Sequence, residues 1–344
     1  MIRRITAIIR RVDVLLILLC SVVSYSLMER YGVLERPLMT ESAPQYNPLP
    51  LSVEAAEQQP DTAPDVRAAR RAAPVRFLMY NVQNYFVDAD PQRARYTRRI
   101  KPVREREATA DVIAVERPEV VGLIEMGGPA ALDDLADRLA KRGLVYPHRR
   151  VLTRWGEDRA LALLSMHPIV EDHSKADCPL LGQTNRTMLR GILDVTIQVK
   201  DKRRFRILGA HLKSRVTENP AAAQAQRARE ARTLAAHVQQ ILKRAPSTLL
   251  LVYGDWNDGP KAPALAVMTQ GSSRATTLQR LKPEDPNGEC WTIYYKEGNE
   301  YNTFDQIYVS DSLNKRMGTK GKRGIILQQQ RGASDHRAVW CDMQ

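Results

Sequence analysis

Cysteine is scarce in this chain, and its four copies lie far apart. Cys20 falls in an apolar N-terminal segment, and Cys178, Cys290 and Cys341 include no Cys-x-x-Cys pair. Four cysteines are too few for a disulfide scaffold, and their spacing matches neither a zinc site nor a thiol-catalysis motif. Export would permit one disulfide with one thiol left over, and buried free thiols are the default expectation.

Aromatic residues and negative charge are also in short supply. Phe, Trp and Tyr together make up 6% of the chain, so a surface for stacking bases is not evident. Lys and Arg number 52 against 39 Asp and Glu, which gives a net charge of +13. Residues 1–72 hold nine basic and eight acidic residues, so nearly all of the excess belongs to the remainder. A basic domain favours a polyanionic substrate, although a generally basic proteome would give the same composition.

Long apolar runs are confined to the N-terminus. Four arginines precede an apolar stretch that begins at Val14 and continues to Met28. This pattern predicts a signal peptide or a membrane anchor over residues 1–30, with Ser24-Tyr25-Ser26 as a tolerable cleavage site. A buried helix of a soluble protein is the third alternative. The positive flank predicts that the rest of the chain is exported, either secreted or periplasmic, or tethered to the membrane.

Residues 31–74 are expected to form a disordered linker. Prolines recur among Ala, Glu, Gln and Arg, and few apolar residues are available for burial. A flexible linker of this length would give an anchored enzyme a reach of roughly 35 Å.

Residues 75–344 contain the pattern of a single domain in which strands dominate and helices lie between some of them. Helices are expected over 102–115, 130–141 and 220–242. Strands are expected over 75–80, 119–124, 145–149, 161–165, 192–199, 205–210, 249–253, 304–309 and 338–341. Sheets with helices on their outer faces fit this pattern.

Polar side chains follow these apolar runs at the points where buried strands end. They are rich in carboxylates, amides and imidazoles: Asn81, Glu125, His211, Asp255, Asn257, Asp305, Asp335 and His336. Such side chains bind hard cations, and together they indicate a metal site for phosphate chemistry.

The order of these motifs resembles the endonuclease/exonuclease/phosphatase superfamily, which has the fold of DNase I. Gly254-Asp255-Trp256-Asn257, the strand Asp305-Gln306-Ile307 and Ser334-Asp335-His336 carry the resemblance, which covers about residues 75–343. It implies an α/β fold, a four-layered α/β sandwich in which two packed mixed β-sheets are flanked by helices.

The resemblance also implies the metal ligands. Glu125 would be the main ligand, with Asn81 and Asp335 beside it, and Asp335 could act through water. Oxygen and amide ligands without thiolates fit Mg²⁺, with Mn²⁺ or Ca²⁺ as substitutes. The ordinary alternatives are a charge at the start of the following helix for Glu125 and a turn residue for Asn81.

Five residues would carry the catalysis. Asp255 would orient and deprotonate the attacking water, and Asn257 would steady the phosphate. These two lie two positions apart, so an extended backbone would turn both side chains the same way. Asp305 would hold His336 in its charged form. His211 would protonate the leaving oxygen, its alternative being a structural histidine.

Further cations could contact the substrate. Arg159 and Lys213 are candidate phosphate ligands, and Asn185 and Arg186 are weaker ones, with a solvated surface as the alternative for each. Asp258 has no role in the resemblance and is expected to cap the next helix.

A dense basic stretch soon after Asn81 could follow a nucleic-acid backbone, or it could be a solvated helix face. It consists of Arg93, Arg95, Arg98, Arg99, Lys101, Arg104 and Arg106.

The sequence therefore predicts an exported, metal-dependent phosphodiesterase that acts as a monomer. A nuclease acting on DNA or RNA is the leading interpretation. A phosphodiesterase or phosphatase directed at phospholipid or sphingomyelin is the alternative within the superfamily, and a membrane-proximal anchor would favour it. A catalytically silent binding module is the alternative from another class. The complete set of eight polar residues argues against a module that has lost its catalytic activity.

Overall fold

A computed structural model describes residues 73–88, 100–183, 185–271, 273–296, 298–318, 324 and 332–344. The predicted N-terminal segment and linker up to residue 72, and the basic residues Arg93, Arg95, Arg98 and Arg99, lie outside these ranges. The chain divides into the units Met1–Ala68 and Ala69–Gln344, and every described residue belongs to the second. Within the described ranges, no helix is both long enough and apolar enough to cross a membrane.

The first sheet has five strands in the order β13-β1-β2-β4-β3. Their bounds are β1 Val75–Tyr85, β2 Val120–Met126, β3 His148–Arg154, β4 Glu157–Ser165 and β13 Val339–Met343. β1 and β2 run parallel, whereas the other neighbours run antiparallel, so the sheet is mixed.

The second sheet has six strands in the order β5-β6-β7-β8-β12-β9, with a parallel pair at β7 and β8. Their bounds are β5 Ile169–Asp172, β6 Leu193–Gln198, β7 Arg204–His211, β8 Leu249–Asp255, β9 Leu278–Arg280 and β12 Asp305–Ser310. A separate hairpin pairs β10 (Ile293–Tyr295) with β11 (Glu300–Asn302).

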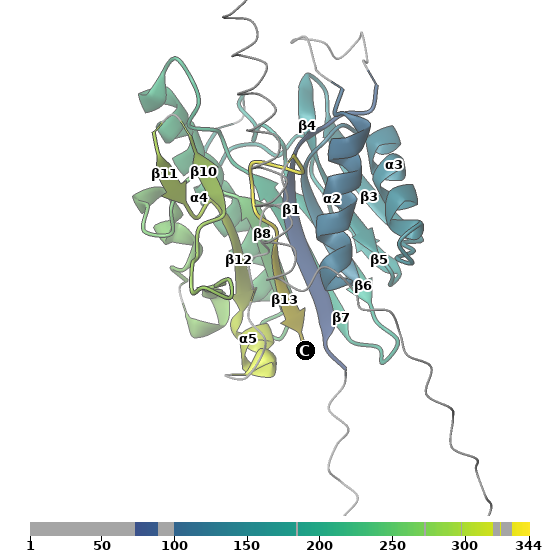
Figure 1. The fold of residues 1–344 in the computed structure, drawn as a ribbon. Helices are drawn as coiled ribbons and strands as arrows, with labels where there is room; N and C mark the ends of the chain where they lie inside the picture. Colours follow the sequence, from purple (N-terminus) through teal and green to yellow (C-terminus); the bar gives the residue numbers. More distant parts are fainter. Residues whose placement is uncertain are drawn as a thin grey trace, which may run out of the picture. The chain divides into compact units, whose positions relative to one another are not determined.

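Helices cover the outer faces of both sheets (Figure 1). α2 (Val103–Glu116) and α3 (Pro129–Ala140) pack on the first sheet, and α4 (Pro220–Arg244) packs on the second. The short elements are α5 (Asp311–Met317) and the 3₁₀ helices η1 (Pro263–Met268) and η2 (Arg274–Thr276). The layers are thus helix, sheet, sheet and helix, which confirms the predicted four-layered α/β sandwich.

Strands in the middle of this sandwich are apolar on both faces. In β1, Phe77 and Met79 enter the core between the sheets, while Leu78 and Tyr80 face α2 and α3. Because successive side chains alternate between faces, a strand buried on both sides must be apolar at every position. The continuous apolar runs noted in the sequence follow from this requirement.

Two glycines, Gly122 in the opposite sheet and Gly209 on the neighbouring strand, make room for the Tyr253 ring between the sheets. A Cβ added at Gly122 would lie 2.5 Å from the Tyr253 ring, and one added at Gly209 would lie 2.6 Å from it. The Tyr253 hydroxyl donates a hydrogen bond to the Ala162 carbonyl, 3.0 Å away in the opposite sheet. Tyr253 therefore ties the two sheets together directly behind the strand end that carries Asp255.

The strand predicted over residues 145–149 was misplaced. The structure begins β3 at His148, because Pro147 has no N–H for a ladder and the buried Tyr146 donates its hydroxyl to the Pro118 carbonyl. The other predicted elements are present, with ends shifted by a few residues.

Candidate active site

Three predicted residues lie side by side at one edge of the second sheet. His211 ends β7, Asp255 ends β8 and Asp305 begins β12. His211 is the register partner of Asp255, which in turn is the partner of Asp305. All three side chains are buried, so the strand register alone places an imidazole and two carboxylates in a row.

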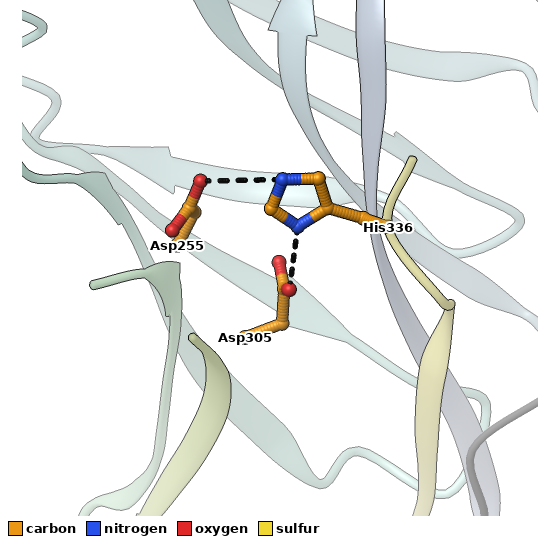
Figure 2. Close-up of side chains that lie close together, drawn as sticks. All are labelled: Asp255, Asp305 and His336. Carbon is orange, nitrogen blue, oxygen red and sulfur yellow. Dashed lines mark hydrogen bonds and ion pairs between the residues drawn. The ribbon is translucent and has the colours of Figure 1, made fainter. Parts of the chain in front are cut away.

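His336 reaches this row from the segment that precedes β13. Its Nδ1 lies 2.7 Å from Asp305 Oδ2, and its Nε2 lies 3.9 Å from Asp255 Oδ2 (Figure 2). Burial by itself would lower the pKa of His336, but the charge and hydrogen bond of Asp305 outweigh burial and raise that pKa well above its usual value. The ring is therefore a cation at neutral pH.

Asn81 joins the two sheets at the same place. Its Nδ2 donates to Asp255 Oδ2 at 3.0 Å and lies 3.4 Å from His336 Nε2. Its Oδ1 accepts the Gln83 N–H at 3.0 Å, which fixes the orientation of the amide. Asn81 is buried, so it is part of the site and not an exposed turn residue.

Glu125 sits at an irregularity in β2. The pairing of β2 with β4 shifts register between Ile124 and Met126, and Glu125 has a φ of 67°. A non-glycine residue rarely adopts this left-handed conformation, and such strain concentrates at functional sites. The bulge directs Glu125 Oε1 to within 3.9 Å of His211 Nε2, while Oε2 accepts the Asn84 N–H at 3.0 Å.

Burial acts in opposite directions on Asp255 and His211. Burial raises the pKa of Asp255. The charge of His336 offsets part of this rise, and the charge of Asp305 adds to it, so that the pKa is about 7. Burial, followed by the charges of Arg190 and Arg159, lowers the pKa of His211 well below its usual value. Asp255 can therefore accept a proton near neutral pH, whereas His211 is a neutral ring in this arrangement.

Asn257 does not follow Asp255 on an extended backbone, so the expectation of an extended backbone through these two residues was wrong. β8 ends at Asp255, and Asn257 has a φ of 49°. Its backbone N–H donates to Asp255 Oδ1 at 2.9 Å, and its side-chain amide donates to the Leu212 carbonyl at 3.1 Å. Asn257 thereby fixes the Asp255 carboxylate and joins the loop after β8 to the loop after β7.

The expectation that Asp258 caps the following helix was also wrong. η1 begins five residues later with Ala262 at its N-cap. Asp258 instead binds Arg215, 2.5 Å away, and Arg227, 3.1 Å away. Two arginines that converge on one carboxylate from separate segments outcompete a local cap.

The other predicted residues lie farther out. Arg159 is partly exposed, with its Nε 2.7 Å from Asn84 Oδ1 and 3.4 Å from Glu125 Oε2, so it borders the site. Lys213 is half-buried, and its backbone N–H donates to Glu230 at 2.7 Å. Asp335 is exposed and accepts from Ser334 Oγ at 3.4 Å. Their assigned roles stay predictions.

The weaker candidates Asn185 and Arg186 are exposed. Arg186 donates to the Gln226 side chain at 2.8 Å.

Two members of the predicted basic stretch are engaged inside the domain. Lys101 is buried and donates to the carbonyls of Val82 and Gln83, at 3.1 and 3.3 Å. Arg106 forms an ion pair with Asp134 at 2.6 Å. These contacts hold the end of β1 in place, and they leave Arg104 as the exposed member within the described ranges.

Two functional features were missed from the sequence. Arg190 is buried, and its charge contributes to the lowered pKa of His211, but nothing in its sequence context distinguishes it from a surface arginine. The β10–β11 hairpin carries clustered aromatic rings, with Tyr301 centred 5.0 Å from Trp291 and 4.7 Å from Tyr294. Ile293 in this hairpin pairs with His336, so the cluster borders the site. The aromatic spacing 291, 294 and 301 was the available signal.

The acidic groups suit a hard divalent cation. Ligand atoms of Asp255, Asp305 and His336 lie within 4.8 Å of one another. Asp305 Oδ1 is buried and has no hydrogen-bond partner among the described residues. Glu125 Oε1 and Asp255 Oδ2 both approach His211 Nε2, at 3.9 and 3.6 Å. These carboxylate oxygens lie close together, and Mg²⁺ prefers oxygen ligands of this kind. Since Asp305 keeps His336 protonated, the carboxylates rather than the imidazole fit the ion.

The cysteines of the described ranges are free thiols, with Cys178 and Cys341 buried and Cys290 exposed.

Known proteins share this fold. The catalytic domain of human Nocturnin, solved with a bound sulfate anion, matches with a TM-score of 0.55 at 18% identity, over 79% of this chain and 94% of that one. Sphingomyelinase C from Streptomyces griseocarneus matches with a TM-score of 0.55 at 18% identity, over 79% of this chain and all (100%) of that one. Truncated TDP2 from Caenorhabditis elegans matches with a TM-score of 0.53 at 15% identity, over 78% of this chain and 97% of that one. No curated protein matches the sequence.

Identities this low establish the fold alone, and the family is established by sequence. The profile of the Endonuclease/Exonuclease/phosphatase family matches residues 81–328, well over half of the chain. This match spans the strand ends that carry Asn81, Glu125, His211, Asp255 and Asp305. The chain therefore belongs to the endonuclease/exonuclease/phosphatase family of phosphoric ester hydrolases, whose members are generally dependent on divalent metal ions.

Proposed function

We propose that this chain is an exported phosphodiesterase that hydrolyses DNA or RNA with the help of Mg²⁺. The observation that carries the proposal is the contact of His336 with Asp305, 2.7 Å long, beside the buried Asp255 carboxylate. This arrangement places an imidazole with a raised pKa and a proton acceptor next to each other. Hydrolysis of a phosphate diester requires both, one for the phosphate charge and one for the attacking water.

Asp255 and His336 have different roles in the proposed hydrolysis. Asp255, with a pKa raised to about 7, accepts a proton from the attacking water. Asn81 and Asn257 hold the two oxygens of the Asp255 carboxylate, so that its orientation is fixed before substrate arrives. His336, kept charged by Asp305, faces the negative charge that develops on the phosphate.

His211 completes the set as a hydrogen-bond donor. Its neutral ring can donate an N–H to the leaving oxygen, and it acts as a full acid only if the negative charge of the bound substrate raises its pKa. A divalent ion held by Glu125 would neutralise part of the phosphate charge. Arg159 adds positive charge at the rim.

The choice of nucleic acid rests on charge and on the aromatic hairpin. The net charge of +13 lies almost wholly outside residues 1–72. Long-range attraction of a polyanion requires such a field. The rings of Trp291, Tyr294 and Tyr301, on the hairpin whose Ile293 pairs with His336, are at least partly exposed and offer a surface on which bases can stack. Nocturnin was solved with a bound sulfate anion, which agrees with anion binding in this fold.

A phospholipid substrate is the second candidate. Sphingomyelinase C has the same fold, and the N-terminal apolar segment would hold an uncleaved chain at a membrane. We propose export by a signal peptide or membrane anchor, and a monomeric state, from the sequence alone.

The deciding experiment incubates the full-length chain in Mg²⁺ with plasmid DNA, structured RNA and sphingomyelin-containing vesicles in parallel. We expect cleavage of a nucleic acid and no release of phosphocholine. The reverse result would replace the nuclease with a lipid phosphodiesterase. Activity on none of the three, with the chain folded and metal bound, would overturn the proposed hydrolysis of nucleic acid and lipid alike.

A further inference from the structure

Two adjoining cavities lie between α4 and η1. The larger has a volume of about 430 Å³ and the smaller about 220 Å³, and both are lined by Gln224 and Pro263. They adjoin at these two shared residues, and we call the two cavities together the α4–η1 groove. Arg215, Arg227 and Asp258 line one end of the groove, and Arg232 and Val267 line the other.

The first end of the groove adjoins the catalytic residues. Asp258 lies three positions after Asp255, and its carbonyl accepts the Gln306 side-chain N–H at 3.1 Å, next to Asp305. Arg227 donates to the Lys213 carbonyl at 3.1 Å, two positions after His211. Both loops that extend from the catalytic strand ends therefore enter the groove.

The second end leads away from the catalytic residues along α4. Pro220, Gln224, Ala228 and Arg232 line the groove and recur at every fourth position, so they lie along one face of the helix. From Pro220 to Arg232 the helix rises about 18 Å. The groove is thus long enough to hold an extended chain, with α4 as one wall and η1 as the other.

The charge of the groove is positive. Three arginines line it against the single carboxylate of Asp258, which Arg215 and Arg227 share. Arg232 is exposed and has no ion-pair partner within the described ranges. Between the charges lie Pro263, Ala264 and Val267, small or apolar side chains that leave room for a ligand. The arginines can bind the phosphates of a nucleic-acid strand, and the apolar side chains between them can contact its sugars.

We propose that the α4–η1 groove binds one strand of nucleic acid on one side of the scissile phosphate. Arg215 and Arg232 contact phosphates of the strand, and the Gln224 side chain donates a hydrogen bond to its sugar–phosphate backbone. Arg227 positions Asp258 and the loop that carries Lys213. This inference rests on the proposed nuclease function and goes beyond it, because it assigns the path of the substrate away from the catalytic centre.

Two variants on α4 test the proposal. Ala228→Glu places a negative charge on the α4 side of the groove, and Arg232→Gln removes one phosphate contact. Ala222→Glu and Arg244→Gln are matched controls, since both positions are exposed on α4 and line neither cavity. The substrates are a 20-nucleotide single strand, at several salt concentrations, and bis(p-nitrophenyl) phosphate, which is too short to extend from the catalytic residues along the groove.

We expect Ala228→Glu to raise the KM for the oligonucleotide at least tenfold. Arg232→Gln should flatten the slope of log affinity against log salt by about 0.7, the value for one contact on a single strand. Neither variant should change turnover of the small diester, and the controls should match the wild type on both substrates.

The outcomes separate the two proposals. Wild-type cleavage of the oligonucleotide with unchanged KM and salt slope in both groove variants would overturn the groove alone. A wild type that cleaves vesicle lipids and no nucleic acid would overturn the proposed function and the groove together. If Ala228→Glu fails to fold, the exposed Arg232→Gln still decides through its salt slope.

Discussion

Asp305 and His336 come from opposite sides of the sandwich and meet through a contact of 2.7 Å between Oδ2 and Nδ1. Both side chains are buried, and they lie 31 positions apart in the sequence. Their contact fixes the charge of the imidazole, because Asp305 is what raises the pKa of His336 against the effect of burial.

Asp305→Asn should therefore reduce turnover by at least about 10²-fold, the scale of losing one charge-stabilising group. The amide can still accept a hydrogen bond from Nδ1, but it cannot hold a proton on the ring at neutral pH. The His336 imidazole should lose its charge at a lower pH in an NMR titration. Asp311→Asn is the control, since Asp311 is a buried carboxylate paired with Lys315 and distant from the catalytic strand ends. Full turnover in Asp305→Asn would contradict the role of the pair.

Asp255→Asn tests the proton acceptor. The substitution keeps the shape and the hydrogen bond from the Asn257 N–H but removes the basic oxygen. We expect kcat to fall by at least about 10²-fold with little change in substrate affinity. An unchanged kcat would remove Asp255 from the reaction.

Removal of metal should abolish hydrolysis. EDTA should stop the reaction and Mg²⁺ should restore it, since the oxygen ligands of the site suit a hard cation. Glu125→Gln should raise the Mg²⁺ concentration needed for half-maximal rate, because it removes one anionic ligand. Full activity in EDTA, with metal content measured as nil, would rule out this requirement.

Gly209→Ala should destabilise the fold. The added Cβ would meet the Tyr253 ring at 2.6 Å, and the Tyr253 hydroxyl is held by Ala162 in the opposite sheet. Overpacking of this kind lowers the free energy of unfolding by about 1–3 kcal/mol. Urea unfolding measures the change, and Gly259→Ala is the control because nothing lies within 4 Å of its added Cβ. Equal losses in both variants would contradict the packing argument.

Asp194 predicts an acid-sensitive component of stability. Burial would raise the pKa of this carboxyl, but the hydrogen bonds from His237 and Arg206, 2.8 and 2.7 Å long, lower it below its usual value. A depressed folded pKa stabilises the protein above the unfolded pKa of about 4, and the contribution disappears as pH falls through the folded value.

Asp194→Asn should thus lower the free energy of unfolding at pH 7 by about 1.5–3 kcal/mol. The difference from wild type should shrink as pH falls below about 4. Urea unfolding at several pH values measures both. A constant difference at all pH values would show that Asp194 acts through shape and not through charge.

The sequence pattern by itself determined the strands and helices, and the resemblance to a known family added the sandwich and the candidate members of the site. Strands buried on both faces must be apolar throughout, so β1 and β8 are visible as continuous apolar runs. The polar residues that follow such runs have to lie at a sheet edge. Asn81 and Asp255 could therefore be assigned to one site from local pattern and resemblance together.

Tertiary structure alone decided how these residues are oriented and charged. The bulge that turns Glu125 toward His211 depends on how β2 pairs with β4, and pairing is a long-range property. Asn257 adopts its left-handed backbone because its amide finds the Leu212 carbonyl on another loop. Asp258 faces two arginines, one of them from α4, rather than its own helix. Burial, which shifts the pKa of Asp255 and His211 in opposite directions, exists only once the two sheets have packed together.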